Sequence, residues 1–341
     1  MKIRANFPHV LGLIGALFMV SVTTGAQQPA PTTPASKFDV TNYRIEAQLI
    51  PDQHLLRAGA DVTFTPLEPT RSVVFELNGS LHVESIERDG VPLTNFVQDA
   101  VGVGALGPSV RVDLGAVVPV GQAVTLRFRW SGALTSPEGG PLATKRLAYV
   151  GTEGSYLMYA ARWFPFHDYA VDRATSEITI IVPTGLQVAG TSDEPVVPQQ
   201  QTKDGTSRYR FVRRQPLLPG NFAVGQYITR TLRFGGYEIQ FNTKPGSENR
   251  INSFAEPMGR VLEFYTQQYG MPASGQKLVV AQTDDDTLDA YSGSGIIFLA
   301  SKLFDTARPV PEDKLEREVA YQWWGQTVGL KSFDDASTLV G

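Results

Sequence analysis

The stretch VTLRFRW, residues 124–130, alternates apolar and polar side chains along its whole length. Alternation with a period of two predicts a β-strand that turns one face to a core and the other to solvent. Similar β-rich segments, several of them alternating, occupy much of the first two thirds of the chain: residues 43–49, 72–77, 178–182 and 209–211. Turn dipeptides such as Asp89-Gly90 and Pro219-Gly220 separate them. We therefore expect residues 38–233 to form a mainly β, antiparallel sandwich domain.

The character of the sequence changes after Phe234. Apolar residues recur with helical spacing at positions 251, 254, 255, 258, 261, 262 and 265. Pro257 is expected to start the regular part of that helix or to kink it, and Gly270 with Pro272 to end it. Strands are expected at residues 237–241, 277–282 and 295–300, and a further helix from Pro311 to about Gly329. Residues 234–341 are therefore predicted to form an α+β domain.

The N-terminal 26 residues have the pattern of a secretory signal peptide. Lys2 and Arg4 precede a short apolar run at residues 10–22, and Thr24-Gly25-Ala26 offers small residues for cleavage. The run is shorter than the roughly 20 residues of a membrane-spanning helix, so an uncleaved anchor is the alternative. A Pro/Thr-rich linker, residues 27–37, follows. We expect an exported protein, periplasmic or extracellular.

Composition excludes several classes of partner and chemistry. The formal net charge is −4 and no basic cluster is present, which argues against nucleic acid and against a membrane partner beyond the signal peptide. The chain contains no cysteine, so disulfides, thiol catalysis and cysteine-bound metals are excluded. No repeat at solenoid or propeller periods is seen.

Three segments, in this order, resemble the membrane alanyl aminopeptidase family, a group of gluzincin zinc metallopeptidases. Residues 162–183 (RWFPFHDYAVDRATSEITIIVP) resemble the fingerprint of the family's N-terminal β-domain. Residues 290–300 (AYSGSGIIFLA) lie where the family has G-A-M-E-N and a following strand. Residues 317–341 (REVAYQWWGQTVGLKSFDDASTLVG) match H-E-L-A-H-Q-W-(W/F)-G, then D-D, then L-N-E-G. The resemblance covers residues 38–341 and implies a β-sandwich followed by a partial thermolysin-like catalytic domain.

The resemblance also implies a zinc site, and this chain departs from it at every ligand. In the family, two His one helical turn apart and a distant Glu bind zinc, while a Glu after the first His is the general base. Here the ligand positions hold Arg317, Tyr321 and Val340, and only the base position, Glu318, is kept. Arg cannot be deprotonated, Val has no donor atom and a neutral Tyr is a poor ligand. We therefore expect no metal and no cofactor, although zinc is typical of the family.

The substrate-binding motif is altered as well. Ser292 stands where the family's Glu binds the free amine of the substrate, between Tyr291 and Gly293. Asp289 is a candidate for that role only because it is nearby. The strand expected at residues 296–299 has an edge that can pair with a peptide backbone. The alternative is an ordinary flexible turn at residues 293–295 before a core strand.

Two further hypotheses concern charge. The formal charges of Arg317 and Glu318 sum to zero, as do those of zinc and its two glutamates in the intact family. We therefore expect Arg317 to point into the empty metal space and to pair with carboxylates there. Asp284-Asp285-Asp286 is either a loose site for a hard cation or a solvated loop.

The chain is expected to be a short member of the family, without the catalytic Tyr and helical domain that follow in its relatives. Whether it is a fragment, a truncated product or a shortened paralogue stays open, as does its oligomeric state. The predicted function is an inactive pseudopeptidase that binds a peptide or partner protein. The alternatives are an active zinc aminopeptidase with an atypical metal site, and a purely structural or interaction β-domain protein.

Overall fold

The structure is a computed structural model and describes residues 36–102, 107–136, 144–201 and 203–329. All of these residues belong to one compact unit, Pro34–Gly341. The expected signal peptide and the position of Val340 lie outside the described residues. The described part is mostly β, and none of its helices is long and apolar enough to cross a membrane.

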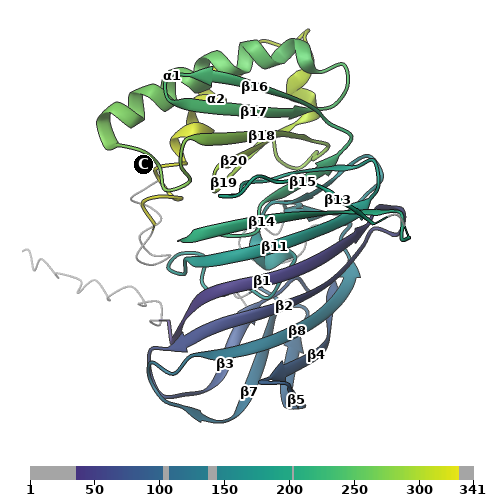
Figure 1. The fold of residues 1–341 in the computed structure, drawn as a ribbon, viewed down its shortest axis with the longest axis vertical. Helices are drawn as coiled ribbons and strands as arrows, with labels where there is room; N and C mark the ends of the chain where they lie inside the picture. The colour runs from purple at the N-terminus through teal and green to yellow at the C-terminus, as the bar shows by residue number, and fades with distance from the viewer. Residues whose placement is uncertain (1–35, 103–106, 137–143, 202, 330–341) are drawn as a thin grey trace, which may run out of the picture. The chain divides into compact units, whose positions relative to one another are not determined.

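The largest element is an eight-stranded sheet in the order β13-β14-β11-β1-β2-β8-β4-β5, which can be followed down Figure 1. Its strands, in chain order, are β1 (Phe38–Ile50), β2 (Leu55–Pro66), β4 (Leu81–Arg88), β5 (Val91–Leu93), β8 (Val124–Ala133), β11 (Ala174–Pro183), β13 (Gln199–Gln201) and β14 (Thr206–Leu217). The expected Asp89-Gly90 turn joins β4 to β5, and both residues have positive φ, as a two-residue hairpin turn requires.

One pairing in this sheet contradicts the antiparallel prediction. β1 and β11 run parallel, with Ile45 opposite Ile178. The two strands lie far apart in the sequence and are joined by a long excursion through other sheets. Only such a crossover connection, and not a hairpin, can place two strands side by side in the same direction. The sheet is therefore mixed.

Two smaller sheets pack with it. A three-stranded sheet has the order β3 (Thr70–Glu76), β7 (Ser109–Val118), β6 (Phe96–Asp99), and a four-stranded sheet has the order β12 (Gln187–Ala189), β15 (Phe222–Gly225), β10 (Ser155–Leu157), β9 (Ala148–Tyr149). Short 3₁₀ helices lie at Pro51–Gln53, Ala160–Arg162, Glu248–Arg250 and Ser301–Phe304.

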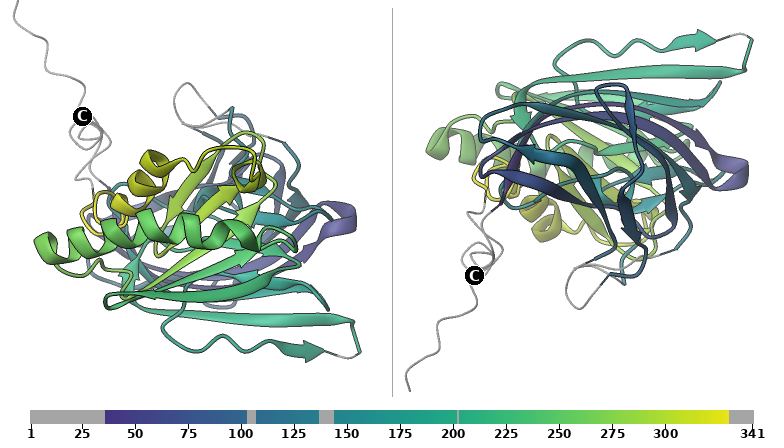
Figure 2. Two further views of the ribbon diagram at one scale, coloured as in Figure 1. Left: turned by 90° about the horizontal axis from the view of Figure 1, so that it is seen from above. Right: turned by 90° about the horizontal axis from the view of Figure 1, so that it is seen from below.

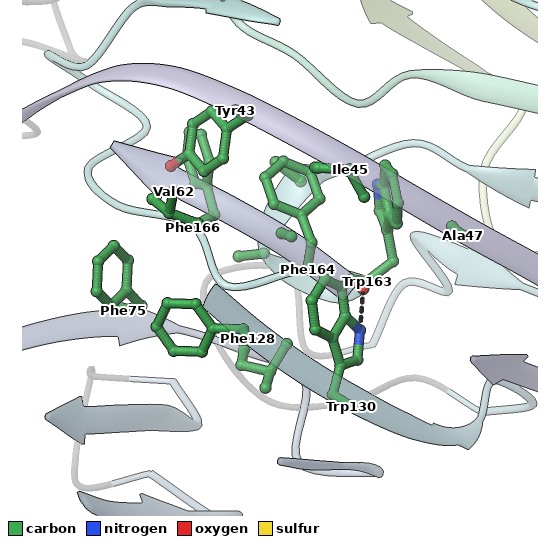
Figure 3. Packing of buried hydrophobic residues seen from close by; sticks show 14 of the residues in the cluster. Tyr43, Ile45, Ala47, Val62, Phe75, Phe128, Trp130, Trp163, Phe164 and Phe166 are labelled. Atoms are coloured by element: carbon green, nitrogen blue, oxygen red, sulfur yellow. Dashed lines mark hydrogen bonds between the residues drawn. The ribbon is translucent and has the colours of Figure 1, made fainter. Parts of the chain in front are cut away.

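The core of this β region is aromatic, and Figure 3 shows its centre. The alternating residues of VTLRFRW behave as predicted, since Val124, Leu126, Phe128 and Trp130 are all buried. The indole of Trp130 donates a hydrogen bond to the backbone oxygen of Trp163 at 2.8 Å. The indole of Trp163 in turn donates to the oxygen of Gly220 at 2.9 Å. Both large rings therefore fill the space beneath the sheet without leaving their N–H groups unpaired.

The second region contains a five-stranded sheet in the order β16 (Ile228–Phe234), β17 (Tyr237–Thr243), β18 (Lys277–Thr283), β20 (Ile296–Ala300), β19 (Ala290–Gly293). The three strands expected here are present. The expected boundary at residues 233/234 needs correction, because β16 is the outer strand of this sheet and the sheet therefore begins at Ile228. β16 is largely exposed, so it gives no apolar signal that would assign it to either region.

Helix α1 (Ile251–Tyr269) packs against β16 and β17, as Figure 2 shows from above. It contains Pro257 within its length, so regular helix begins before this residue. Helix α2 (Glu312–Ala320) starts after Pro311 as expected, but the prediction that it runs to Gly329 is wrong. After Ala320 the N–H groups of Gln322 and Trp323 bond oxygens three residues back, and Gly325 takes a φ of 121°, which ends helical geometry.

Candidate active site

The retained acid, Glu318, lies on the buried face of α2 and is 8% exposed. The hydroxyl of Ser292 on β19 lies 2.7 Å from its Oε2 atom and 2.7 Å from its backbone oxygen. Burial raises the pKa of Glu318, and the Ser292 hydroxyl, Arg317 and Lys314 offset part of that shift. Ser292, at the position of the family's amine-binding Glu, is therefore in direct hydrogen-bond contact with Glu318, at the position of the general base.

The two helix positions that correspond to zinc ligands lie one turn apart, since the backbone N–H of Tyr321 donates to the oxygen of Arg317 at 3.1 Å. The expectation that Arg317 fills the metal space is wrong. Its side chain is exposed, and within the described residues it pairs with no carboxylate. Leu315, Glu318 and Val319 face the core, and the helical period then turns position 317 to solvent. Its charge still acts on Glu318 by lowering that residue's pKa.

The residues present do not fit zinc. Arg317 points outward and has no lone pair to donate, and Tyr321 is a half-buried phenol at the end of the helix. The third position, Val340, lies outside the described residues. The described part of the chain has no group of three or more His, Cys, Asp or Glu side chains placed to hold a metal ion.

The edge of the five-stranded sheet is β19 and not the segment around residues 296–299. That segment forms β20, which lies between β18 and β19 and has both edges paired. The expected pairing of a peptide with residues 296–299 is therefore wrong, because an interior strand has no free backbone groups.

Two glutamines that follow α2 bind the end of β19 and the turn that joins β19 to β20. Gln322, 1% exposed, donates to the oxygen of Gly293 at 3.0 Å and accepts from the N–H of Gly295 at 2.8 Å. Gln326 donates to the oxygen of Ser292 at 3.4 Å. The amide of Gln322 therefore holds the turn between β19 and β20, whereas the bond from Gln326 to Ser292 lies on the free edge of β19 itself.

Tyr291 projects from β19 into a cluster of hydroxyls. It hydrogen bonds with Tyr169, which also bonds with Gln326. Burial, reinforced by Tyr169 and Tyr159, raises the pKa of Tyr291 well above its ordinary value, so the phenol stays neutral. These rings leave a cavity of only about 10 Å³, lined by residues that include Met158, Tyr159, Tyr169, Asn221, Tyr291 and Gln326. That volume is at the lower limit for a single water molecule.

A second partly buried acid, Glu76, lies at the far side of this cluster and hydrogen bonds with Tyr159. Burial raises the pKa of Glu76, and the nearby charge of Arg162 opposes the shift. The sequence does not identify Glu76, Tyr159, Tyr169 and Gln326 as members of the site. Tyr169 and Gln326 lie within the quoted motif segments, but nothing in those segments shows which side chains meet.

Asp289 has a role other than amine binding. Its carboxylate pairs with Lys302 at 2.6 Å and with Lys314. These two hydrogen bonds lower the pKa of Asp289 to about 2. Asp289 directly precedes β19, so its contact with Lys314 links that strand to the N-terminal part of α2. Each oxygen of the carboxylate already faces a lysine of this chain.

The acidic run at residues 284–286 makes protein contacts. Asp284 pairs with Lys244 and accepts a hydrogen bond from Ser301 at 2.7 Å, and Asp286 pairs with Arg146. Asp285 accepts from the backbone of Thr287 at 2.9 Å and from the hydroxyl of Tyr156 at 3.2 Å. The run thus ties the five-stranded sheet to the β region, which accounts for its charges without a cation.

Comparisons with known proteins support the fold assignment. No protein-family model matches the chain. Among curated proteins it is similar to "Probable aminopeptidase 1" of Saccharolobus solfataricus, 26% identical over 187 residues. That match covers 52% of this chain and 24% of the relative, so the chain spans about a quarter of the relative's length.

Among solved structures, an M1 zinc metallopeptidase from Deinococcus radiodurans superposes with a TM-score of 0.67 at 19% identity, over 90% of this chain and 69% of that one. A mutant two-domain M1 zinc metallopeptidase bound to L-arginine gives a TM-score of 0.68 at 19% identity, over 88% of this chain and 67% of that one. The described fold is therefore that of the two-domain M1 zinc metallopeptidases. The resemblance to the gluzincin aminopeptidases, first indicated by three motifs, is confirmed by the curated match and by these structures.

Proposed function

We propose that this protein is a pseudopeptidase: an aminopeptidase-like scaffold, built as a β-sandwich and a partial thermolysin-like domain, that binds a peptide or partner protein without hydrolysing it. The observation that carries the proposal is the outward direction of Arg317. A residue that bound or replaced the metal would face Glu318 and the space over β19, whereas Arg317 faces solvent.

The condition of Glu318 supports the same conclusion. In the family such a carboxylate accepts a proton from a metal-polarised water. Here it is buried against Ser292. Without a metal, a water molecule keeps its ordinary pKa, which is far too high for a carboxylate to deprotonate it at a useful rate. The tyrosine-lined cavity near Tyr291 has a volume of only about 10 Å³, too small for a substrate side chain.

The binding half of the proposal rests on apolar exposure next to this site. Phe264 and Tyr269 on α1 are 56% and 57% exposed, and Tyr269 contacts the ring of Trp324 at a centroid distance of 5.1 Å. Exposed aromatic side chains of this kind are enriched where proteins contact one another. A peptide can add to the free edge of β19 only if the amide of Gln326, which bonds the oxygen of Ser292, first turns away.

The proposal is tested on purified residues 27–341. Bound metal is measured by elemental analysis, and hydrolysis of aminoacyl anilides is followed with and without added zinc, beside the matched variant Glu318→Gln. We expect no stoichiometric zinc and no hydrolysis above that of Glu318→Gln. Stoichiometric zinc with chelator-sensitive turnover that Glu318→Gln abolishes would contradict the proposal and favour an active enzyme with an atypical site.

The site of action is proposed from the N-terminal sequence. Residues 1–26 are typical of a cleaved signal peptide, which supports a periplasmic or extracellular location for the mature protein. Edman sequencing of protein recovered from the export compartment is expected to begin at Gln27.

A further inference from the structure

The solvent-facing side of the eight-stranded sheet carries a hollow of about 570 Å³ over its central strands β1, β2 and β8, which lie side by side in Figure 1. The opposite side of the same strands is core, with Tyr43, Val62 and Phe128 fully buried. The hollow is remote from Glu318 and has the volume of an ordinary small-molecule site, which ranges from roughly 300 to 1,000 Å³.

The floor of the hollow is Gly59, in the middle of β2. This residue does not have positive φ, so its backbone does not require glycine. A Cβ atom built on it would meet the oxygen of Phe128 at 3.4 Å and the Cγ atom of Arg129 at 4.0 Å, which are van der Waals contacts. Glycine weakens a central strand, and where no local strain explains it, it marks a place where another group approaches the sheet closely.

Three arginines surround this glycine. Arg129 lies directly opposite Gly59 on β8, and Arg57 precedes Gly59 by two residues on the same face of β2. Arg44 on β1 is opposite Asp61, which follows Gly59 by two residues. Diagonal neighbours on one face of a sheet are about 7–8 Å apart, within reach of long side chains. The three guanidinium groups can therefore converge above Gly59.

These arginines have no ion-pair partner within the described residues, and all three are exposed. The carboxylates that line the hollow already have donors: Asp61 is bonded by Arg127, Glu46 by Arg208, Glu177 by Arg210 and Glu84 by Ser131. Arg44 acts on Glu177 only through its positive charge. That charge lowers the pKa of Glu177, after the larger effects of the hydrogen bond and the charge of Arg210. The hollow therefore presents three guanidinium groups without an ion-pair partner around an open floor, beside one carboxylate, Glu84, whose partner is an uncharged hydroxyl.

We propose that the hollow over Gly59 binds a compact anion with two or more phosphate groups, held by Arg44, Arg57 and Arg129. A guanidinium group offers parallel N–H donors that match the oxygens of a phosphate, so each arginine can make a bidentate contact. Several phosphates are needed to engage all three groups at once. Gly59 lets the anion lie against the sheet, where its charge is less screened than in open solvent.

The first test is isothermal titration calorimetry with inorganic pyrophosphate at physiological ionic strength. Wild-type protein is expected to bind it, and Arg57→Gln and Arg129→Gln are each expected to weaken binding about tenfold, because one charge-assisted contact is lost. The matched control is Arg230→Gln, since Arg230 is an exposed arginine on β16 that makes no ion pair within the described residues. This control is expected to bind as wild type does.

The second test changes space and leaves charge unaltered. Gly59→Val is expected to keep or raise thermal stability, since a β-branched residue suits a central strand, and to abolish pyrophosphate binding by filling the floor. Three results would overturn the proposal: no binding by wild type, equal weakening by Arg230→Gln, or unchanged binding by Gly59→Val. None of these measurements depends on peptide hydrolysis or on zinc, so they stand apart from the pseudopeptidase proposal.

Discussion

The hydroxyl of Ser292 lies 2.7 Å from a carboxylate oxygen of Glu318, so a side chain on the sheet edge holds the retained acid of α2. In the family these two positions face a metal and the amine of a substrate. In this chain they face each other, and both have become part of the packing between β19 and α2. Substitutions at this contact and around it therefore have defined consequences for stability and metal binding.

Glu318→Gln tests the effect of burial on the acid. The pKa of Glu318 is raised in the folded state, so the folded protein holds a proton that the unfolded chain has already lost. The stability that Glu318 contributes is therefore present below about pH 4.5, the ordinary pKa of a glutamate. It falls as pH rises through the higher pKa of the folded state. Gln does not titrate, so urea unfolding from pH 4 to 8 is expected to favour Glu318→Gln increasingly at higher pH.

The exposed Glu263→Gln on α1 serves as control for removing a carboxylate from the same region. A difference between wild type and Glu318→Gln that stays constant across this pH range would contradict burial as the cause.

Ser292→Ala removes the hydroxyl donor. Loss of one hydrogen-bond partner of this buried acid is expected to lower the unfolding free energy by about 1–3 kcal/mol at neutral pH. The pKa of Glu318 is expected to rise further, because the Ser292 bond is the largest of the contributions that lower it. Ser292→Thr keeps a hydroxyl and is expected to recover most of the loss in urea unfolding. Equal loss in both variants would point to packing and not to the hydrogen bond.

Gln322→Ala removes a buried amide from the turn between β19 and β20. The N–H of Gly295 loses its side-chain partner and the oxygen of Gly293 loses one of its donors, and an unsatisfied buried group costs about 1–3 kcal/mol. Urea unfolding is therefore expected to show one of the larger losses for a polar substitution in this chain. Gln267→Ala, at an exposed position of α1, is expected to change stability by less than about 0.5 kcal/mol. If both variants behave alike, the turn between β19 and β20 is not held by Gln322.

Asp289→Asn removes a carboxylate whose pKa is lowered to about 2 by Lys302 and Lys314. A depressed pKa contributes stability above the ordinary value of 3.8, and that contribution disappears as pH falls through about 2. The groups are partly exposed, so the expected loss at pH 7 is only about 1 kcal/mol. Unfolding at pH 7 and pH 2 is compared with Asp52→Asn, an exposed acid that makes no ion pair in the described part of the chain. A loss of the same size at both pH values would exclude the ion pairs as its source.

Arg317→His combined with Tyr321→His tests the altered ligand positions. The two residues are one helical turn apart, the spacing at which two imidazoles bind one zinc ion. The double variant is expected to bind about one equivalent of zinc, seen by equilibrium dialysis, and the single Arg317→His variant much less. Zinc bound equally by wild type would show that metal is held elsewhere.

Several features were predictable because they depend on local periodicity. The alternation of VTLRFRW indicates a strand and its buried face, and the helical spacing after Ile251 indicates α1. The three motifs in their order are enough to indicate the M1 fold, because each is a continuous run of residues. The length of α2 was not predictable, because Trp323 and Trp324 are compatible with a helix, and the helix ends through tertiary packing and Gly325.

From the sequence alone, the motifs predict which residues stand at the catalytic positions, with Arg317, Tyr321 and Val340 at the ligand positions of the family's zinc site. The sequence also determined most strands, since the side-chain period of a strand is local. Only the tertiary structure decided that β1 pairs in parallel with β11, that Arg317 faces solvent, that Gln322 holds the turn between β19 and β20, and that Gly59 lies beneath three arginines. Each of these depends on which distant segments are neighbours, and that is set by the packing of the whole core and not by any local pattern.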